Sequence, residues 1–247
     1  MAVQSFRKKH QGRHIMKVGI IGAMDVEIEL LRELLQDAEV TPVLGMDFIE
    51  GRLAGHDVVV VRCGIGKVNA AVCAQALVGR FGATHLVNTG VAGSLDARLD
   101  VGDLVVATDC VHHDFSVAPL GYAPGLIPGR ERVEFVADAL MRRAALEAAA
   151  AVAPEVRTVE GRVASGDQFI AEQADRDWIF SSFHAMCCEM EGAAIAQVAT
   201  LNGVPFAVVR AISDKPGAED QAMTYAQFEE AAAHRCARIV AHMVAAL

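Results

Sequence analysis

The sequence is poor in aromatic side chains and lacks any long, unbroken apolar run. Aromatic residues make up 5% of the 247 residues, whereas apolar residues of all kinds make up 53%. The core must therefore consist mainly of Ala, Val, Leu and Ile, a composition that suits a parallel sheet covered by helices on both faces. Because no apolar run reaches the ~18 residues of a membrane-spanning helix, we expect no membrane association.

The cysteines also lack the patterns that mark a metal site or a disulfide scaffold. The six cysteines form no CxxC pair, so we expect buried thiols in a reducing cytoplasm. The run His112-His113-Asp114 has metal-ligand residue types, but adjacent residues of a strand point to opposite faces. No further ligand has the spacing of a zinc site, and the sequence predicts neither a metal nor another cofactor.

Basic residues are outnumbered by acidic residues, most of all outside the first fifteen positions. The formal net charge is -9, although residues 1–15 contain four Lys or Arg and no acidic residue. The acidic remainder does not offer the basic surface that nucleic acids bind, which favours a small neutral or cationic ligand. Residues 1–15 lack the apolar segment of a signal peptide. We predict a disordered basic leader at 1–15 and one folded domain at 16–247.

The hydrophobic pattern alternates short strands with helices along the whole chain. Such alternation predicts a single α/β domain with a mixed, mostly parallel central sheet flanked by helices. The expected strands are 17–22, 41–44, 48–53, 57–62, 85–88, 103–111, 159–165, 185–190 and 204–214. The expected helices are 25–36, 68–81, 135–152, 175–180, 191–201 and 225–247, and the Gly- and Pro-rich segment 119–130 is expected to be a loop.

Carboxylates follow three of the expected strands. Glu27 follows the first strand, Glu189 and Glu191 lie at a strand-to-helix junction, and Asp214 follows the last strand. Ligands bind beyond the carboxyl ends of such strands, where these groups would converge. If the strand persists that far, alternation would place Glu189 and Glu191 on one side of the chain and Met190 on the other. Hydrolysis of a glycosidic bond needs one acid and one base beside that bond, and converging carboxylates could supply both. The alternative interpretation of any single carboxylate is a solvated residue at a helix start or a partner in an ion pair.

The glycine pairs do not match a nucleotide-binding fingerprint. In Gly64-Ile65-Gly66-Lys67 the lysine is followed by Val68 rather than Ser or Thr, which excludes a Walker loop, and no GxGxxG follows a strand. These glycines are interpreted as turn residues, or as positions where the backbone approaches a ligand closely.

Seven motifs together carry a specific resemblance. They are GIIGAMDVEIELL, GIGKVNAA, NTGVAGSL, VGDLVVA, SGDQFI, EMEGAAIA and VVRAISD. In this order and spacing they resemble the 5′-methylthioadenosine/S-adenosylhomocysteine nucleosidase family, of the purine nucleoside phosphorylase superfamily. The resemblance implies a nucleoside phosphorylase-like fold and a hydrolase of methionine salvage. This hydrolase would split these nucleosides into adenine and a 5′-thio-substituted ribose.

The resemblance also implies roles for individual residues. Glu27 would be the ionised base that activates water. Asp214, held by Ser213, would be the acid that protonates the imidazole ring of adenine, which requires a pKa raised from ~3.9 by burial or by neighbouring carboxylates. Glu191 would hold the ribose hydroxyls, and Phe169 would stack on the purine. Further substrate contacts are expected from Met190, Arg210, Glu189, Val91, Ala92, Gly93, Tyr225 and the backbone of Ile170.

The loop 117–128 resembles a family segment that a neighbouring subunit contributes to the 5′ end of the pocket. Val117, Leu120 and Pro128 are the matching positions, which implies a homodimer. The chain departs from the family at Val91, where Ser is frequent, at Leu120, where an aromatic is common, and at Tyr225, where Phe is usual. Three alternatives stay open: a futalosine or aminodeoxyfutalosine nucleosidase, a nucleoside phosphorylase, and a non-catalytic nucleoside-binding module.

Overall fold

The computed structural model describes residues 16–218 and 220–247, and the leader expected at 1–15 lies outside the described residues. The strands are β1 (Lys17–Gly22), β2 (Gln36–Val43), β3 (Met46–Leu53), β4 (His56–Arg62), β5 (His85–Ser94), β6 (Leu104–His112), β7 (Phe135–Val136), β8 (Thr158–Ser165), β9 (Cys187–Glu189) and β10 (Phe206–Asp214). The helices are α1 (Asp25–Leu34), α2 (Lys67–Gly79), α3 (Ala139–Val152), α4 (Gln173–Phe183), α5 (Gly192–Asn202) and α6 (Gln221–Ala245), with a 3-10 turn η1 (Ala118–Leu120).

One mixed sheet organises the domain. Parallel pairing joins β4, β1, β5 and β10 at its centre and also joins β6, β8 and β9. Antiparallel pairing adds β3 and β2 beyond β4 and links β10 to β6 and β5 to β9. Strand β5 therefore pairs with both β9 and β10, so that β5, β10, β6, β8 and β9 form a closed ring. The site residues lie at the carboxyl ends of strands in and beside this ring.

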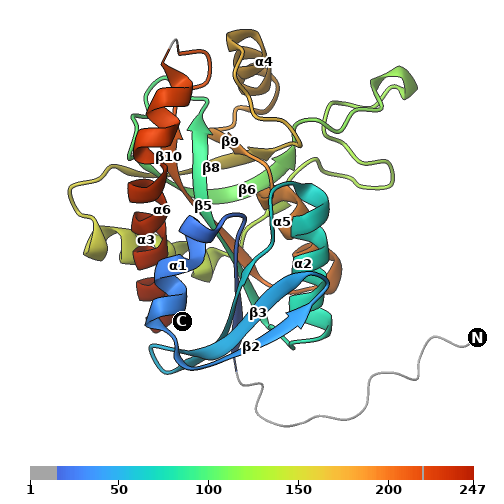
Figure 1. Ribbon diagram of the computed structural model, residues 1–247. Coiled ribbons are helices and arrows are strands. Elements are labelled where there is room, and N and C mark those ends of the chain that lie inside the picture. The colour runs from blue at the N-terminus through green and yellow to red at the C-terminus, as the bar shows by residue number, and fades with distance from the viewer. Residues whose placement is uncertain (1–15, 219) are drawn as a thin grey trace, which may run out of the picture.

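Helices cover both faces of the sheet, as the apolar composition predicts. One buried cluster packs α2 and α5 against the sheet, with Leu77 and Ile195 among its members. The other packs α1, α3 and α6 against the opposite face, with Leu31, Met141 and Ile239. Figure 1 shows α1, α3 and α6 on one side and α2 and α5 on the other. Central strands such as β4, whose Val58–Val61 run is fully buried, are apolar because both of their faces lie in the core.

Several expected boundaries were wrong by a few residues. The first helix ends at Leu34 instead of continuing to Gln36, because Leu35 is extended and Gln36 pairs with Arg52 in the sheet. The helix expected from Phe135 begins at Ala139, since 135–136 pair with β6 and Asp138 caps the helix by accepting from two backbone N–H groups. The last helix begins at 221 instead of 225, and the strand expected at 185–190 is limited to 187–189.

The cysteines are buried, as the sequence predicts, and so are the two adjacent histidines. All six cysteines are buried free thiols. His112 and His113 are both buried, and His112 bonds Gln197 through Nε2. Within residues 16–218 and 220–247, no group of three or more His, Cys, Asp or Glu side chains has a geometry that could hold a metal ion. No helix in this described part of the chain combines the length and apolarity needed to cross a membrane.

Candidate active site

A predominantly apolar pocket at the carboxyl ends of β1, β5, β9 and β10 brings together most of the residues that the sequence predicts. The predicted residues that line it are Glu27, Val91, Ala92, Gly93, Phe169, Ile170, Glu189, Met190, Glu191, Arg210, Ser213, Asp214 and Tyr225. Val117, Leu120 and Pro128 do not line it within this single chain. They lie on the loop after β6, which projects from the body of the domain in Figure 1.

Glu27 lies in the first turn of α1 with its carboxylate held on three sides. Oε2 accepts from the backbone N–H of Ala23 over 2.6 Å and of Met24 over 3.1 Å, and Oε1 accepts from Val91 N–H over 3.0 Å. Arg210 Nη1 lies 3.9 Å from Oε1. Burial raises the pKa of Glu27, while Arg210 and the three N–H groups favour the ionised form. The side chain is thus a fixed carboxylate with the enhanced basicity that a general base needs.

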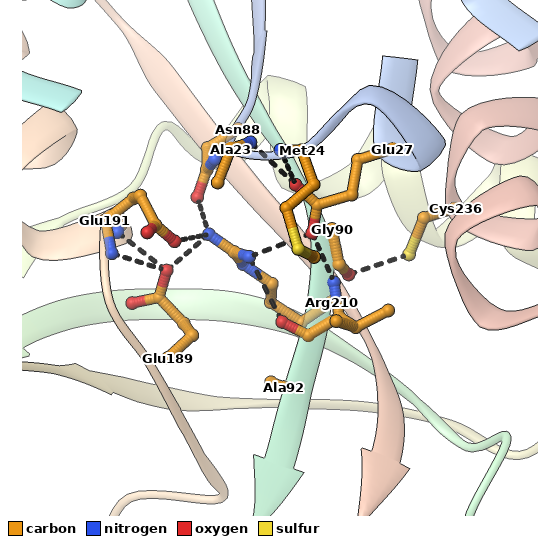
Figure 2. A network of polar contacts seen from close by, with 12 residues as sticks. Ala23, Met24, Glu27, Asn88, Gly90, Ala92, Glu189, Glu191, Arg210 and Cys236 are labelled. Carbon is orange, nitrogen blue, oxygen red and sulfur yellow. Dashed lines mark hydrogen bonds and ion pairs between the residues drawn. The ribbon is translucent and has the colours of Figure 1, made fainter. Parts of the chain in front are cut away.

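Arg210 links the carboxylates of the pocket. Figure 2 shows its guanidinium between Glu27 on one side and Glu189 and Glu191 on the other. It donates to Glu189 and to Asn88 Oδ1 through Nη2, and to the Val91 carbonyl over 3.1 Å through Nη1. Burial alone would lower the pKa of Arg210, but the three carboxylates hold it above its ordinary value. The guanidinium therefore stays charged and partly neutralises an acidic pocket.

Glu189 and Glu191, at the start of α5, have different hydrogen-bond partners. Glu189 accepts from Ser165 Oγ and from the N–H groups of Glu191 and Gly192, which caps the helix. Glu191 accepts from Gly66 N–H over 2.9 Å. Burial and the charge of Glu189 raise the pKa of Glu191 to about 7, against the effect of the Arg210 guanidinium. The charge of Glu191 therefore changes near neutral pH.

The alternation expected at this junction requires a strand that continues to Glu191, and the strand is shorter than that. Strand β9 ends at Glu189, so the strand rule no longer applies to Met190 and Glu191. Glu189, Met190 and Glu191 all line the same pocket. The turn into α5 therefore gives the pocket one thioether beside two carboxylates.

Asp214 ends β10, is buried and lines the same pocket. Its Oδ1 accepts from Ser213 Oγ over 2.7 Å, and its Oδ2 accepts from Gln221 Nε2 over 2.8 Å. Burial raises the pKa of Asp214, although both hydrogen bonds favour the ionised form. Arg210 makes its ion pairs with the three glutamates and not with Asp214. This argues against the interpretation that Asp214 serves only as an ion-pair partner. The pocket therefore contains a second carboxyl group suited to carry a proton.

Two aromatic residues and one aliphatic residue form the apolar wall beside Asp214. Phe169 and Tyr225 meet edge to face with ring centroids 5.8 Å apart, and Phe169 is 56% exposed. The Tyr225 hydroxyl donates to Glu229 over 2.9 Å. Ile170 is buried, and its carbonyl accepts from Gln221. An exposed ring beside an open pocket can stack on a planar ligand.

Sequence reasoning missed the residues that hold the pocket's charged groups. Asn88 and Ser165 contact Arg210 and Glu189, and both lie in motifs whose other residues attracted attention. Gln221 lies in a segment without any recognisable pattern. Pocket-lining residues that were not predicted are Ala23, Met24, Ile65, Gln168, Cys188 and Pro216.

Comparisons with known proteins give a consistent result. A family model described as the phosphorylase superfamily matches residues 17–245. The 5′-methylthioadenosine/S-adenosylhomocysteine nucleosidase of Geobacillus sp. (strain WCH70) is 39% identical over 233 residues, which cover 94% of this chain and 99% of that protein. The nucleosidase of the same name from Colwellia psychrerythraea 34H, solved in complex with adenine, has a TM-score of 0.88 at 38% identity, over 93% of this chain and 94% of that one. The futalosine hydrolase of Helicobacter pylori strain 26695 has a TM-score of 0.89 at 32% identity, over 96% of this chain and 100% of that one.

Proposed function

The chain belongs to the phosphorylase superfamily, and from this premise we propose that it hydrolyses the N-glycosidic bond of 5′-methylthioadenosine and S-adenosylhomocysteine. The products are adenine and the 5′-thio-substituted ribose. Relatives that carry this activity in their names match nearly the whole chain. The chain is thus a hydrolytic N-glycosidase.

One observation supports hydrolysis rather than phosphorolysis. Glu27 and Asp214 line the same pocket, and the Arg210 guanidinium of that pocket already contacts carboxylates. Arg210 is the only basic side chain among the described residues that line the pocket, and its guanidinium contacts three carboxylates. A phosphorylase needs a free cation to hold phosphate, and these carboxylates would repel that anion. Water is therefore a better co-substrate than phosphate here.

Asp214 is proposed as the general acid. Adenine is a poor leaving group until a nitrogen of its imidazole ring is protonated, and burial raises the pKa of Asp214, which favours the protonated form that an acid needs. Phe169 stacks on the purine, and the backbone of Ile170 contacts its edge. Ser213 holds the acid through Oδ1. In this arrangement the proton reaches the ring as the glycosidic bond breaks.

Glu27 is proposed as the general base for the attacking water. Loss of adenine leaves positive charge on the ribose ring, and the surrounding carboxylates stabilise that charge in a pocket with little water. Glu191 accepts from the ribose hydroxyls, with Met190 against the sugar and Glu189, Val91, Ala92, Gly93 and Tyr225 around it. Glu27 then takes a proton from the water that adds to the ribose.

We further propose a homodimer in which the loop 117–128 closes the neighbouring subunit's pocket. Leu120 is 74% exposed in the single chain, which leaves an apolar side chain free for an alkylthio group. Such an enzyme would act in the cytoplasm, where six buried thiols stay reduced, and would serve methionine salvage. Gel filtration of the full chain tests the dimer directly, and a fully active monomer would contradict it.

A futalosine-type substrate is the second candidate, because the Helicobacter pylori futalosine hydrolase has the same fold over the full chain. Its lower identity, 32% against 38% for the adenine-bound nucleosidase, places it second. The two candidates share the chemistry and differ only in the group on the ribose 5′ carbon.

Chromatographic detection of adenine released from methylthioadenosine, with and without phosphate, tests the proposed function. Adenine and free methylthioribose in equal amounts, at a rate independent of phosphate, are expected. Strict dependence on phosphate would make the chain a phosphorylase. Release from aminodeoxyfutalosine but not from methylthioadenosine would move the assignment to the second candidate. No cleavage despite tight nucleoside binding would indicate a binding module.

A further inference from the structure

Both carboxylate oxygens of Asp214 are occupied by side-chain donors from different elements. Ser213, which donates to Oδ1, precedes the acid in β10. Gln221, which donates to Oδ2, is the first residue of α6 and lies seven positions further along the chain. The second donor is therefore supplied by tertiary structure and not by the strand that carries the acid.

Pro216 explains why this second donor is a side chain. An aspartate carboxylate commonly accepts a hydrogen bond from the backbone N–H two residues further on. Two residues after Asp214 stands Pro216, which has no N–H to donate. A buried carboxylate without that partner needs another donor. Gln221 is buried, with 6% of its surface exposed, and supplies it.

The Gln221 carboxamide is itself fixed in orientation. Its Oε1 accepts from Gly217 N–H over 3.3 Å. Its Nε2 donates to the Ile170 carbonyl over 2.9 Å as well as to Asp214 over 2.8 Å. The reversed amide would set its oxygen against two acceptors, so only one orientation satisfies all three partners. One nitrogen thus bridges Asp214 and Ile170.

We propose that Gln221 is a positioning residue that orients the acid Asp214 against the backbone of Ile170, in place of the backbone donor that Pro216 removes. The inference rests on the proposed function, in which both groups face the same purine. Because they belong to separate segments, the shared amide sets their spacing. The N–H donated to Oδ2 also favours the ionised carboxyl, which tempers the effect of burial on the pKa of Asp214.

The effect of the Gln221 hydrogen bond on the pKa of Asp214 can be measured, because the neighbouring titratable groups do not obscure it. Burial raises the pKa of the Cys188 thiol on β9 and of the Tyr225 hydroxyl on α6, so both are neutral around pH 7. The Lys215 ammonium is engaged by Asp100 over 2.7 Å. The pH at which Asp214 loses its proton therefore depends mainly on burial, Ser213 and Gln221.

Gln221→Met, which keeps the side-chain length and removes both N–H donors, tests the proposal in the full chain. We expect kcat for methylthioadenosine to fall about tenfold, the equivalent of one hydrogen bond. The basic limb of the kcat–pH profile should move to higher pH, because the carboxylate loses a donor. Adding Pro216→Ala to this variant restores a backbone N–H two residues from Asp214, and we expect recovery of most of the lost activity and of the original limb. Gln227→Met, at an exposed glutamine of the same helix, is the matched control and should change neither.

A merely structural role for Gln221 would lower Tm while leaving kcat and the pH profile unchanged, and that result would overturn the proposal. If Gln221→Met does not fold, Gln221→Glu replaces it, because it keeps the side-chain shape and places a second carboxyl group beside Asp214. The basic limb of the kcat–pH profile should then move to higher pH. An unshifted limb in that variant would equally overturn the proposal. Absence of adenine release by the unmodified protein would instead refute the proposed function, and the inference with it.

Discussion

Gly90 lies directly against the carboxylate of Glu27. A Cβ atom at this position of β5 would overlap Glu27 Oε1 and would lie 2.6 Å from Arg210 Nη1. Glu27 and Arg210 therefore both lie so close to the Gly90 backbone that only glycine fits at this position. A glycine in the NTGVAGSL motif thus serves close approach of charged groups and not merely a turn.

Gly90→Ala should consequently inactivate the enzyme more than it unfolds it. The added methyl group pushes Glu27 and Arg210 from their positions, and a displacement of ~1 Å in such a site costs about 100-fold in rate. The free energy of unfolding should fall by about 1–3 kcal/mol, as for other overpacked core sites. Adenine release and thermal unfolding measure the two effects. Gly79→Ala, in helix α2 where an added Cβ meets only the Gln75 side chain, is the control and should leave both nearly unchanged.

Glu27→Gln and Asp214→Asn should each abolish turnover while the protein stays folded. The first removes the carboxylate that takes a proton from water, and the second removes the proton donor for adenine, so each should cost about 10²–10⁴ in kcat. Single-turnover assays with methylthioadenosine give the rates, and circular dichroism reports the fold. Near-native activity in either variant would show that its side chain has been assigned the wrong role.

The sequence predicted the carboxylates that line the pocket better than the residues that hold them. Glu27 lies in the first turn of the helix after β1 and Asp214 ends β10, so the strand pattern places both at the ligand-binding edge of the sheet. Asn88 and Gln221 act through contacts with residues 122 and 7 positions away, which no local pattern encodes. The course of the chain at Met190 was also beyond prediction, because it depends on where β9 stops pairing.

Glu191 should make stability depend on pH. Burial raises its pKa from an ordinary value of 4.5 to about 7 in the folded state. A carboxyl group of this kind stabilises the fold at low pH, and the contribution is lost as pH rises through the folded pKa. Tm should therefore fall between pH 5 and pH 8, and Glu191→Gln should make that fall smaller. The fall should not vanish, because the pKa values of Glu27 and Asp214 are raised as well. An equal fall in the variant would show that Glu191 does not titrate in this range.

Lys67 should affect substrate binding more than the chemical step. Its ammonium pairs with Asp114 over 2.5 Å, and its backbone N–H donates to Asp167. These contacts fix the loop whose Gly66 N–H donates to Glu191. Lys67→Met should raise KM several-fold with a smaller change in kcat, because the proposed ribose contact is loosened while acid and base stay in place. Arg143→Met, which breaks the exposed Arg143–Glu147 pair on α3, should leave KM unchanged. A lower kcat at constant KM would contradict this role for the loop.

The proposed exchange of loops between subunits can be tested by mixing two inactive variants. Asp214→Asn disables the acid but keeps the loop 117–128, whereas Leu120→Asp keeps the acid and places a charge on the exposed apolar tip of that loop. If each loop serves the partner's pocket, a mixed dimer has one site with an intact acid and an intact loop. Random mixing makes half of the dimers mixed, so the mixture should recover about a quarter of wild-type activity. If each loop serves its own subunit, every site in a mixed dimer carries one defect and no activity returns. The unmixed variants, refolded separately, give the baseline against which recovery is judged.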